Sequence, residues 1–74
     1  MWERVSARLE GMMQWQSFKT WFAPAFIDRI EAGAVVLNVP SHFFAEWIEE
    51  HYSETVVEAL RAEGVEVERV EGEA

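Results

Sequence analysis

Large apolar side chains at the start of the chain recur every three or four residues, which is the spacing of one face of an α-helix. They predict a first helix from residue 2 to residue 12 or 13. Its apolar stripe consists of Trp2, Val5, Leu9 and Met12. A second stripe predicts a short helix that Pro24 ends, because proline disfavours helical geometry in the residue before it. This second stripe consists of Trp15, Phe18 and Phe22, with Trp21 on its flank.

The pattern then changes to that of strands. Residues 26–30 and 34–39 predict two strands joined by a turn at Ala32-Gly33. A long helix is predicted next, with Ser41 as its N-cap and Gly64 as its left-handed stop, so that it ends near residue 62 or 63.

Strict alternation in Val65-Glu66-Val67-Glu68 predicts a third strand with one solvent-exposed face. Residues 71–74 are expected to form a frayed tail or the start of a linker, which leaves residues 1–70 as a single domain. The order helix, helix, strand, strand, helix, strand predicts an α+β fold, in which helices cover one face of a small three-stranded sheet.

The composition narrows the class of protein. A chain of 74 residues has room for one small domain, and its ten aromatic residues supply the large side chains that a small core needs. It has no cysteine, which excludes disulfides, cysteine zinc sites and thiol nucleophiles. The longest uncharged stretch, residues 32–45, is shorter than the ~20 apolar residues of a membrane span. No secretory signal is recognisable, so a cytoplasmic protein with no membrane partner is expected.

The net charge of −8 is unevenly distributed. Residues 1–43 carry four acidic and four basic side chains, whereas residues 44–74 carry ten glutamates against Arg61 and Arg69. Tight nucleic-acid binding draws on clustered lysines and arginines, and the sequence contains no such cluster. The acidity is interpreted mainly as a solvated surface that keeps a small domain soluble.

Residues that could carry chemistry do not combine into a site. No glycine-rich phosphate loop is present. His42 and Glu46 are four residues apart, with His51 further along, but nothing at a recognisable spacing completes a metal site. A row of carboxylates at four-residue spacing shares one solvated environment, which does not split pKa values for acid–base catalysis. This row consists of Glu46, Glu50, Glu54 and Glu58. The sequence predicts no catalytic residue, cofactor or metal.

Two aromatic residues are candidates for an interaction surface. Phe43 and Phe44 are adjacent, so they point about 100° apart, and the apolar stripe of the helix favours Phe44 for the core. Phe43 is then partly exposed, unless it packs under a neighbouring loop. Trp2 lies in the first turn of its helix, where it serves either as an anchor for self-association or as the end of the core. Trp15 is assigned to the core.

The spacing of large residues resembles that of a known family. The first part of the pattern is Trp2, fifteen residues, Phe18, two residues, Trp21, two residues, Pro24. The second part is Val39-Pro40-Ser41-His42-Phe43, followed by Trp47-Ile48 and Tyr52. Together they resemble the N-terminal domain of DnaA, the bacterial chromosome replication initiator, from Trp2 to about Leu60, and the final Val-Glu strand fits the last element of that family.

The resemblance implies an assembly domain with a K-homology-like α+β fold. In that family the domain mediates weak self-association of the initiator, helps to recruit the replicative helicase and docks replication regulators. The ATPase and the origin-binding helices lie in later domains, so no cofactor is expected here. Single-stranded DNA is expected to bind weakly at most.

The resemblance also suggests roles for individual residues. Trp2 matches a tryptophan implicated in self-association, and Phe43 matches an aromatic residue implicated in helicase and regulator contact. Ser41 falls in the same surface patch. Ser17 stands where some members have an acidic residue used in helicase contact. The alternative function is a small K-homology-like module that binds single-stranded nucleic acid, which the charge and the missing G-x-x-G motif disfavour.

Overall fold

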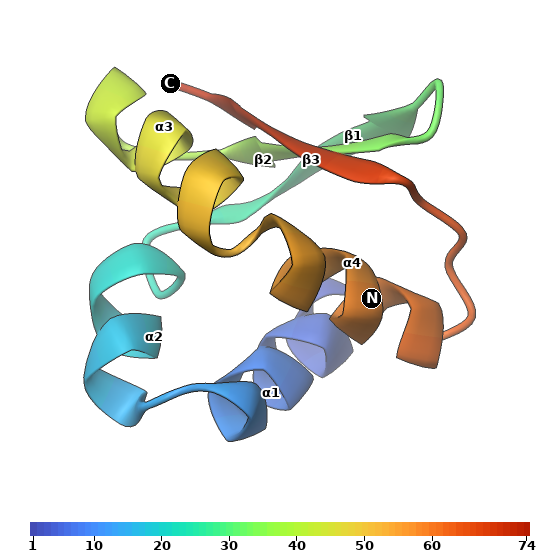
Figure 1. The fold of residues 1–74 in the computed structure, drawn as a ribbon, viewed down its shortest axis with the longest axis horizontal. Helices are drawn as coiled ribbons and strands as arrows, with labels where there is room; N and C mark the ends of the chain where they lie inside the picture. Colours follow the sequence, from blue (N-terminus) through green and yellow to red (C-terminus); the bar gives the residue numbers. More distant parts are fainter.

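The computed structural model describes residues 1–74 and shows four helices and a three-stranded mixed sheet (Figure 1). In chain order the elements are α1 (Trp2–Met12), α2 (Trp15–Trp21), β1 (Phe26–Glu31), β2 (Ala34–Asn38), α3 (His42–His51), α4 (Ser53–Ala62) and β3 (Arg69–Glu73). The α+β fold class and the order of elements are confirmed, with the last helix divided in two. No helix is both long and apolar enough to cross a membrane.

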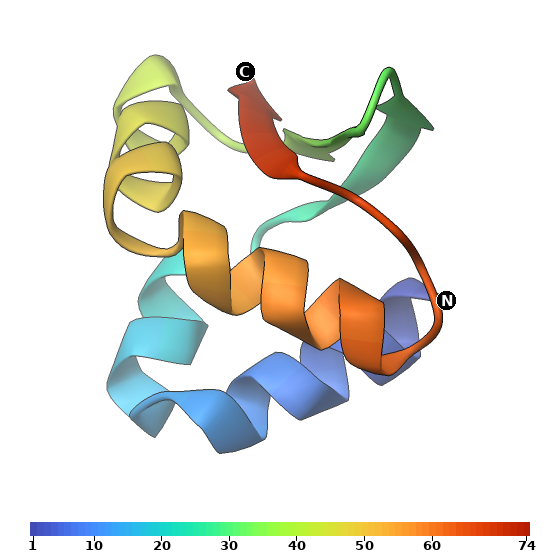
Figure 2. The same ribbon diagram turned by 45° about the vertical axis from the view of Figure 1, so that its right-hand side comes forward.

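The sheet has the strand order β1-β2-β3, with one antiparallel and one parallel pair of strands. β1 and β2 form an antiparallel hairpin whose turn uses the left-handed residues Ala32 (φ 50°) and Gly33 (φ 79°). β3 returns on the far side of β2 and runs parallel to it, from the Ala34–Arg69 pair to the Asn38–Glu73 pair. Helices α1, α2 and α4 lie on one side of the sheet, and α3 packs beside β3 (Figure 2).

Fifteen buried apolar residues form one core cluster. It draws on α1, β2, α3, α4 and β3, and on Phe22 and Ala25 in the segment that follows α2. Further aromatic side chains pack around this cluster while staying partly exposed, among them Trp2, Phe18 and Trp21. The core therefore sits between the helices and one face of the sheet.

The long helix expected over residues 41–62 is in fact two helices that meet at Tyr52. Tyr52 has φ −124° and ψ 8°, outside the helical region, and its ring packs edge-on against Phe22 at 5.5 Å. The break lets α3 pack against β3 while α4 turns to pack against α1. Hydrophobic spacing could not reveal it, because the apolar stripe continues in step through Tyr52.

The third strand was expected over residues 65–68, and this placement is wrong. Residues 65–68 are the crossing from α4 to the sheet, and the Gly33 carbonyl accepts hydrogen bonds from the N–H groups of Glu68 (2.7 Å) and Arg69 (3.2 Å). Parallel pairing with β2 begins only there. Glu71, expected to open a frayed tail, lies inside β3 together with Gly72 and Glu73.

Candidate functional site

The start of α3 is fixed by Ser41, as the sequence predicts. Ser41 has an extended backbone (φ −155°, ψ 166°), and its Oγ accepts a hydrogen bond of 3.4 Å from the Phe44 N–H. A side-chain cap of this kind satisfies one of the backbone donors that a helix leaves free at its first turn. The cap sets the direction of the first side chains of α3, including Phe43.

Phe43 is 62% exposed, which is the largest exposed fraction among the large apolar side chains that face solvent. The helical-wheel expectation for Phe43 is therefore confirmed, and the alternative of a loop-covered ring is wrong. Its ring centroid lies 5.8 Å from Trp21 on α2 and 6.0 Å from Trp47 on α3. Phe44 turns inward instead, and its ring meets Trp21 edge-on at 5.0 Å.

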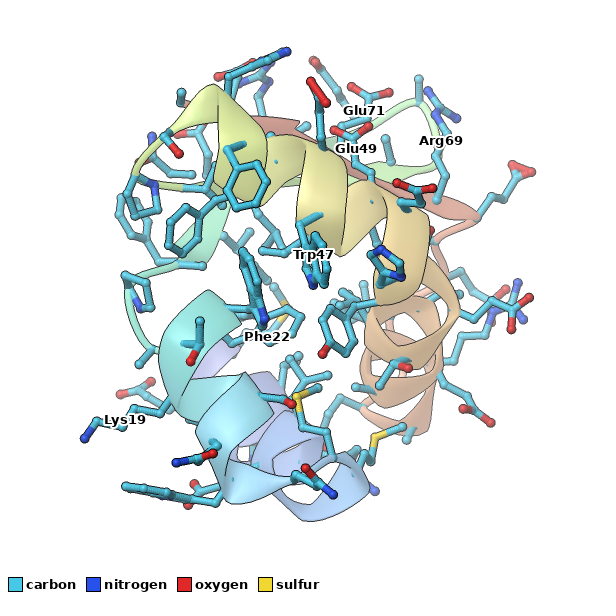
Figure 3. The ribbon with its side chains drawn as sticks, turned by 60° about the vertical axis from the view of Figure 1, so that its left-hand side comes forward. Lys19, Phe22, Trp47, Glu49, Arg69 and Glu71 are labelled. Atoms are coloured by element: carbon cyan, nitrogen blue, oxygen red, sulfur yellow. The ribbon has the colours of Figure 1, made fainter.

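Behind Phe43 the two tryptophans join α2 to α3. The rings of Trp21 and Trp47 are stacked at 4.9 Å with an interplanar angle of 9°, and the His51 ring lies 4.2 Å from that of Trp47. Trp47 projects from α3 toward α2, whereas Glu49 lies on the side of α3 near Glu71 of β3 (Figure 3). We call the group of Trp21, Phe43, Phe44, Trp47 and His51 the aromatic surface.

Trp47 is only partly buried. Its Nε1–H is the single buried side-chain polar atom without a hydrogen-bond partner. Stacking on Trp21 therefore holds this ring in place without help from a polar contact. Rigid support of this kind is what an exposed neighbouring ring needs to keep one orientation.

Ser17 is related to the aromatic surface through its position on α2. It lies on α2 one helical turn before Trp21, so the two side chains share a face of that helix. Ser17 is partly buried. The structure thus places Ser17 on the Trp21 face of α2, and Ser41 at the start of α3, two residues before Phe43.

Trp2 lies on α1, outside the aromatic surface. It opens α1, is partly buried and packs against the core cluster. The N-terminus lies beside α4, well away from the start of α3 (Figures 1 and 2). The two sets of candidate residues therefore belong to different surfaces of the molecule.

Trp15 was assigned to the core, and this assignment is wrong. It is 59% exposed, and the Lys19 ammonium lies 4.9 Å from the centre of its ring. α2 has only seven residues, and the core space beside it is filled by Phe22 and bordered by Phe18. No signal in the sequence separates Trp15 from those two residues, because all three share the same helical spacing.

The arginines are mostly engaged in ion pairs away from the aromatic surface. Arg8 binds Glu63 through Nε (3.1 Å) and Nη2 (2.7 Å), and this hydrogen bonding holds the pKa of Glu63 below its usual range. Arg29, on the outer face of the sheet, binds Glu73 at 2.8 Å. That contact lowers the pKa of Glu73 and, with further hydrogen bonds to Glu31 and Asp28, raises the pKa of Arg29.

The break at Tyr52 also divides the row of carboxylates at four-residue spacing between two helices. Glu46 and Glu50 lie on α3, whereas Glu54 and Glu58 lie on α4, where they line a shallow depression. The depression is lined by Ser53, Glu54, Val57, Glu58, Arg61 and Glu68. No three His, Cys, Asp or Glu side chains come together in an arrangement that could hold a metal ion. His42 instead lies 3.1 Å from Glu46.

Comparison with known proteins agrees with the resemblance in the residue spacing. The family model described as the DnaA N-terminal domain matches residues 1–62. The chain is 36% identical over 70 residues to the chromosomal replication initiator protein DnaA of a Bradyrhizobium species, covering 95% of the chain and 15% of that relative. It is 38% identical over 60 residues to the DnaA of Pelobacter propionicus, covering 81% of the chain and 13% of the relative. The chain thus spans about a seventh of the length of the curated relatives it matches.

Proposed function

The chain belongs to the DnaA N-terminal domain family, and from this premise we propose that it is the assembly domain of a chromosomal replication initiator. In this role it associates weakly with other copies of itself and docks the replicative helicase and regulatory proteins at the chromosome origin. The work takes place on the bacterial chromosome, so its proposed location is the cytoplasm. The proposal assigns it no reaction and no cofactor.

The observation that carries this proposal is the exposure of Phe43. Its ring is 62% exposed yet rests on Trp21 and Trp47, which stack on each other at 4.9 Å. Binding hot spots are enriched in aromatic side chains that project from rigid surroundings and lose their water on contact. The aromatic surface has these properties. Ser41, at the start of α3, and Ser17, one turn before Trp21 on α2, are proposed to form its polar border.

Self-association is proposed to involve Trp2. This residue lies in the first turn of α1 and remains partly exposed, so it offers an apolar edge to a second copy. Weak contacts of this kind suffice when several initiator molecules are held close together, because the effective concentration of each domain is then high.

One observation favours a second function, weak binding of single-stranded DNA. Exposed Trp15 with Lys19 above its ring combines a stacking platform with a positive charge, as single-strand binding surfaces do. The ten glutamates that follow residue 43 oppose a phosphate backbone, so this affinity stays low and depends strongly on salt.

The docking role can be tested by calorimetry with the replicative helicase of the source bacterium. Phe43→Ala is expected to weaken binding by about tenfold or more, as truncation of a hot-spot residue does. Phe26→Ala is the matched control, because Phe26 is 51% exposed on β1 and takes part in none of the ring contacts of the aromatic surface. Equal losses in both variants, or none in either, would contradict the proposed docking surface.

A further inference from the structure

The arginines of this domain form their ion pairs with carboxylates outside α3, so the glutamates of α3 have no arginine partner. Arg4 and Arg8 bind Glu63, Arg29 binds Asp28, Glu31 and Glu73, and Arg69 binds Glu71. No carboxylate of α3 pairs with an arginine or lysine, because α3 contains neither residue type and the ion pairs of the arginines all involve other elements. Glu50 makes no ion pair, and the one side-chain contact of Glu46 is with His42, at 3.1 Å.

Glu46 follows the exposed Phe43 by one turn of α3. The two residues are three apart on α3, a spacing at which helical side chains are neighbours. Glu46 and its partner His42 are both largely exposed, with side-chain exposures of 66% and 86%. The contact between them is therefore solvent-screened and easily exchanged for another. The same relation recurs one turn later between Trp47 and Glu50.

The α2 side of the aromatic surface lacks the negative charge of the α3 side. α2 contains no acidic residue, and its one charged side chain, Lys19, lies over Trp15. An incoming group therefore meets aromatic rings bordered on the α3 side by carboxylates. This combination attracts a cation that can also use the face of a ring.

We propose that the partner reads this surface with an arginine, whose guanidinium lies over the open face of Phe43 and pairs with Glu46 in place of His42. This inference rests on the proposed docking function and specifies the chemistry of its partner. A guanidinium fits better than an ammonium because it is planar, stacks on aromatic rings and pairs with carboxylates through two N–H groups. An acidic segment is disfavoured because it would meet Glu46 and Glu50.

The test measures the dissociation constant of this domain and the replicative helicase of the source bacterium at low and at high salt. Glu46→Gln removes the charge but keeps the shape, and should weaken binding at low salt by about three- to fivefold while flattening the salt dependence. Phe43→Leu keeps an apolar side chain without the ring face, and should weaken binding by about two- to fivefold. Glu10→Gln on α1 is the matched control, because Glu10 is also exposed and forms no ion pair.

Three outcomes separate the possibilities. Weaker binding and a smaller salt dependence for Glu46→Gln, with Glu10→Gln unchanged, support the arginine contact. Unchanged affinity and salt dependence for Glu46→Gln, while Phe43→Ala still weakens binding by about tenfold or more, would overturn the arginine contact and leave the docking function standing. Absence of binding by the unmodified domain at either salt concentration would overturn the docking function, and the arginine contact with it.

Discussion

Gly72 is the position at which a single added methyl group should disturb the fold most clearly. A Cβ at Gly72 would lie 2.6 Å from the Cβ and 2.7 Å from the Cα of Ala45, so α3 and β3 would have to move apart. The Gly72 N–H also donates a 2.7 Å hydrogen bond to Glu49 of α3, which this movement would stretch. Gly72 has no positive φ, so space alone makes glycine necessary there.

Gly72→Ala should therefore destabilise the domain by about 3 kcal/mol, the upper part of the usual range for overpacking, because the clash includes a backbone atom. A domain of this size has a total stability of about 4–11 kcal/mol, so the loss is a large fraction of it. The midpoint of thermal unfolding should fall by about 12–24 °C. Ala45→Gly would not restore it, since the Ala45 Cα remains in place.

Gly11→Ala is the matched control for this substitution. Gly11 lies in α1 with nothing within 4 Å of an added Cβ, so the change should raise stability by about 0.5–1 kcal/mol. Thermal unfolding followed by circular dichroism compares the two variants. If Gly72→Ala unfolds at the same temperature as the unmodified domain, the close packing of Gly72 on β3 against Ala45 on α3 would be refuted.

The remaining predictions concern self-association, acid stability and DNA binding. Trp2→Ala should shift the sedimentation profile at high concentration toward monomer, and an unchanged profile would remove Trp2 from self-association. The pKa of Glu63 is lowered in the folded state by Arg8, so its ion pair stabilises the domain above its ordinary pKa of 4.5 and is lost as pH falls through the lower folded value. Glu63→Gln should thus be less stable at pH 7, and the difference should shrink on acidification. A difference that stays constant down to pH 3 would refute this role. Trp15→Ala should reduce retention on single-stranded DNA at low salt, and equal retention would exclude the Trp15 platform.

Local sequence signals predicted the elements that depend on local chemistry. The Ser41 cap, the stop at Pro24 and the turn at Ala32-Gly33 follow from backbone preferences of those residues, and the structure has each of them where expected. The exposure of Phe43 could also be predicted, because Phe44 already occupied the core direction.

Features that depend on distant contacts could not be predicted. The break at Tyr52 arises because α3 and α4 pack against different elements, and no residue there disfavours helix strongly. The third strand was misplaced because alternation in residues 65–68 is a stronger local signal than the charged sequence of β3. Pairing with β2 fixes its true position. The exposure of Trp15 likewise depends on how little of α2 the core can cover.

The docking role of the aromatic surface is tested most directly by nuclear magnetic resonance. Isotope-labelled domain is titrated with the replicative helicase of the source bacterium, and amide and indole shifts are followed for the unmodified chain and for Phe43→Ala. Shifts centred on residues 41–47 and on the Trp21 and Trp47 indoles, and lost in the variant, are the predicted result. Shifts confined to other surfaces, or an unchanged response in Phe43→Ala, would contradict it.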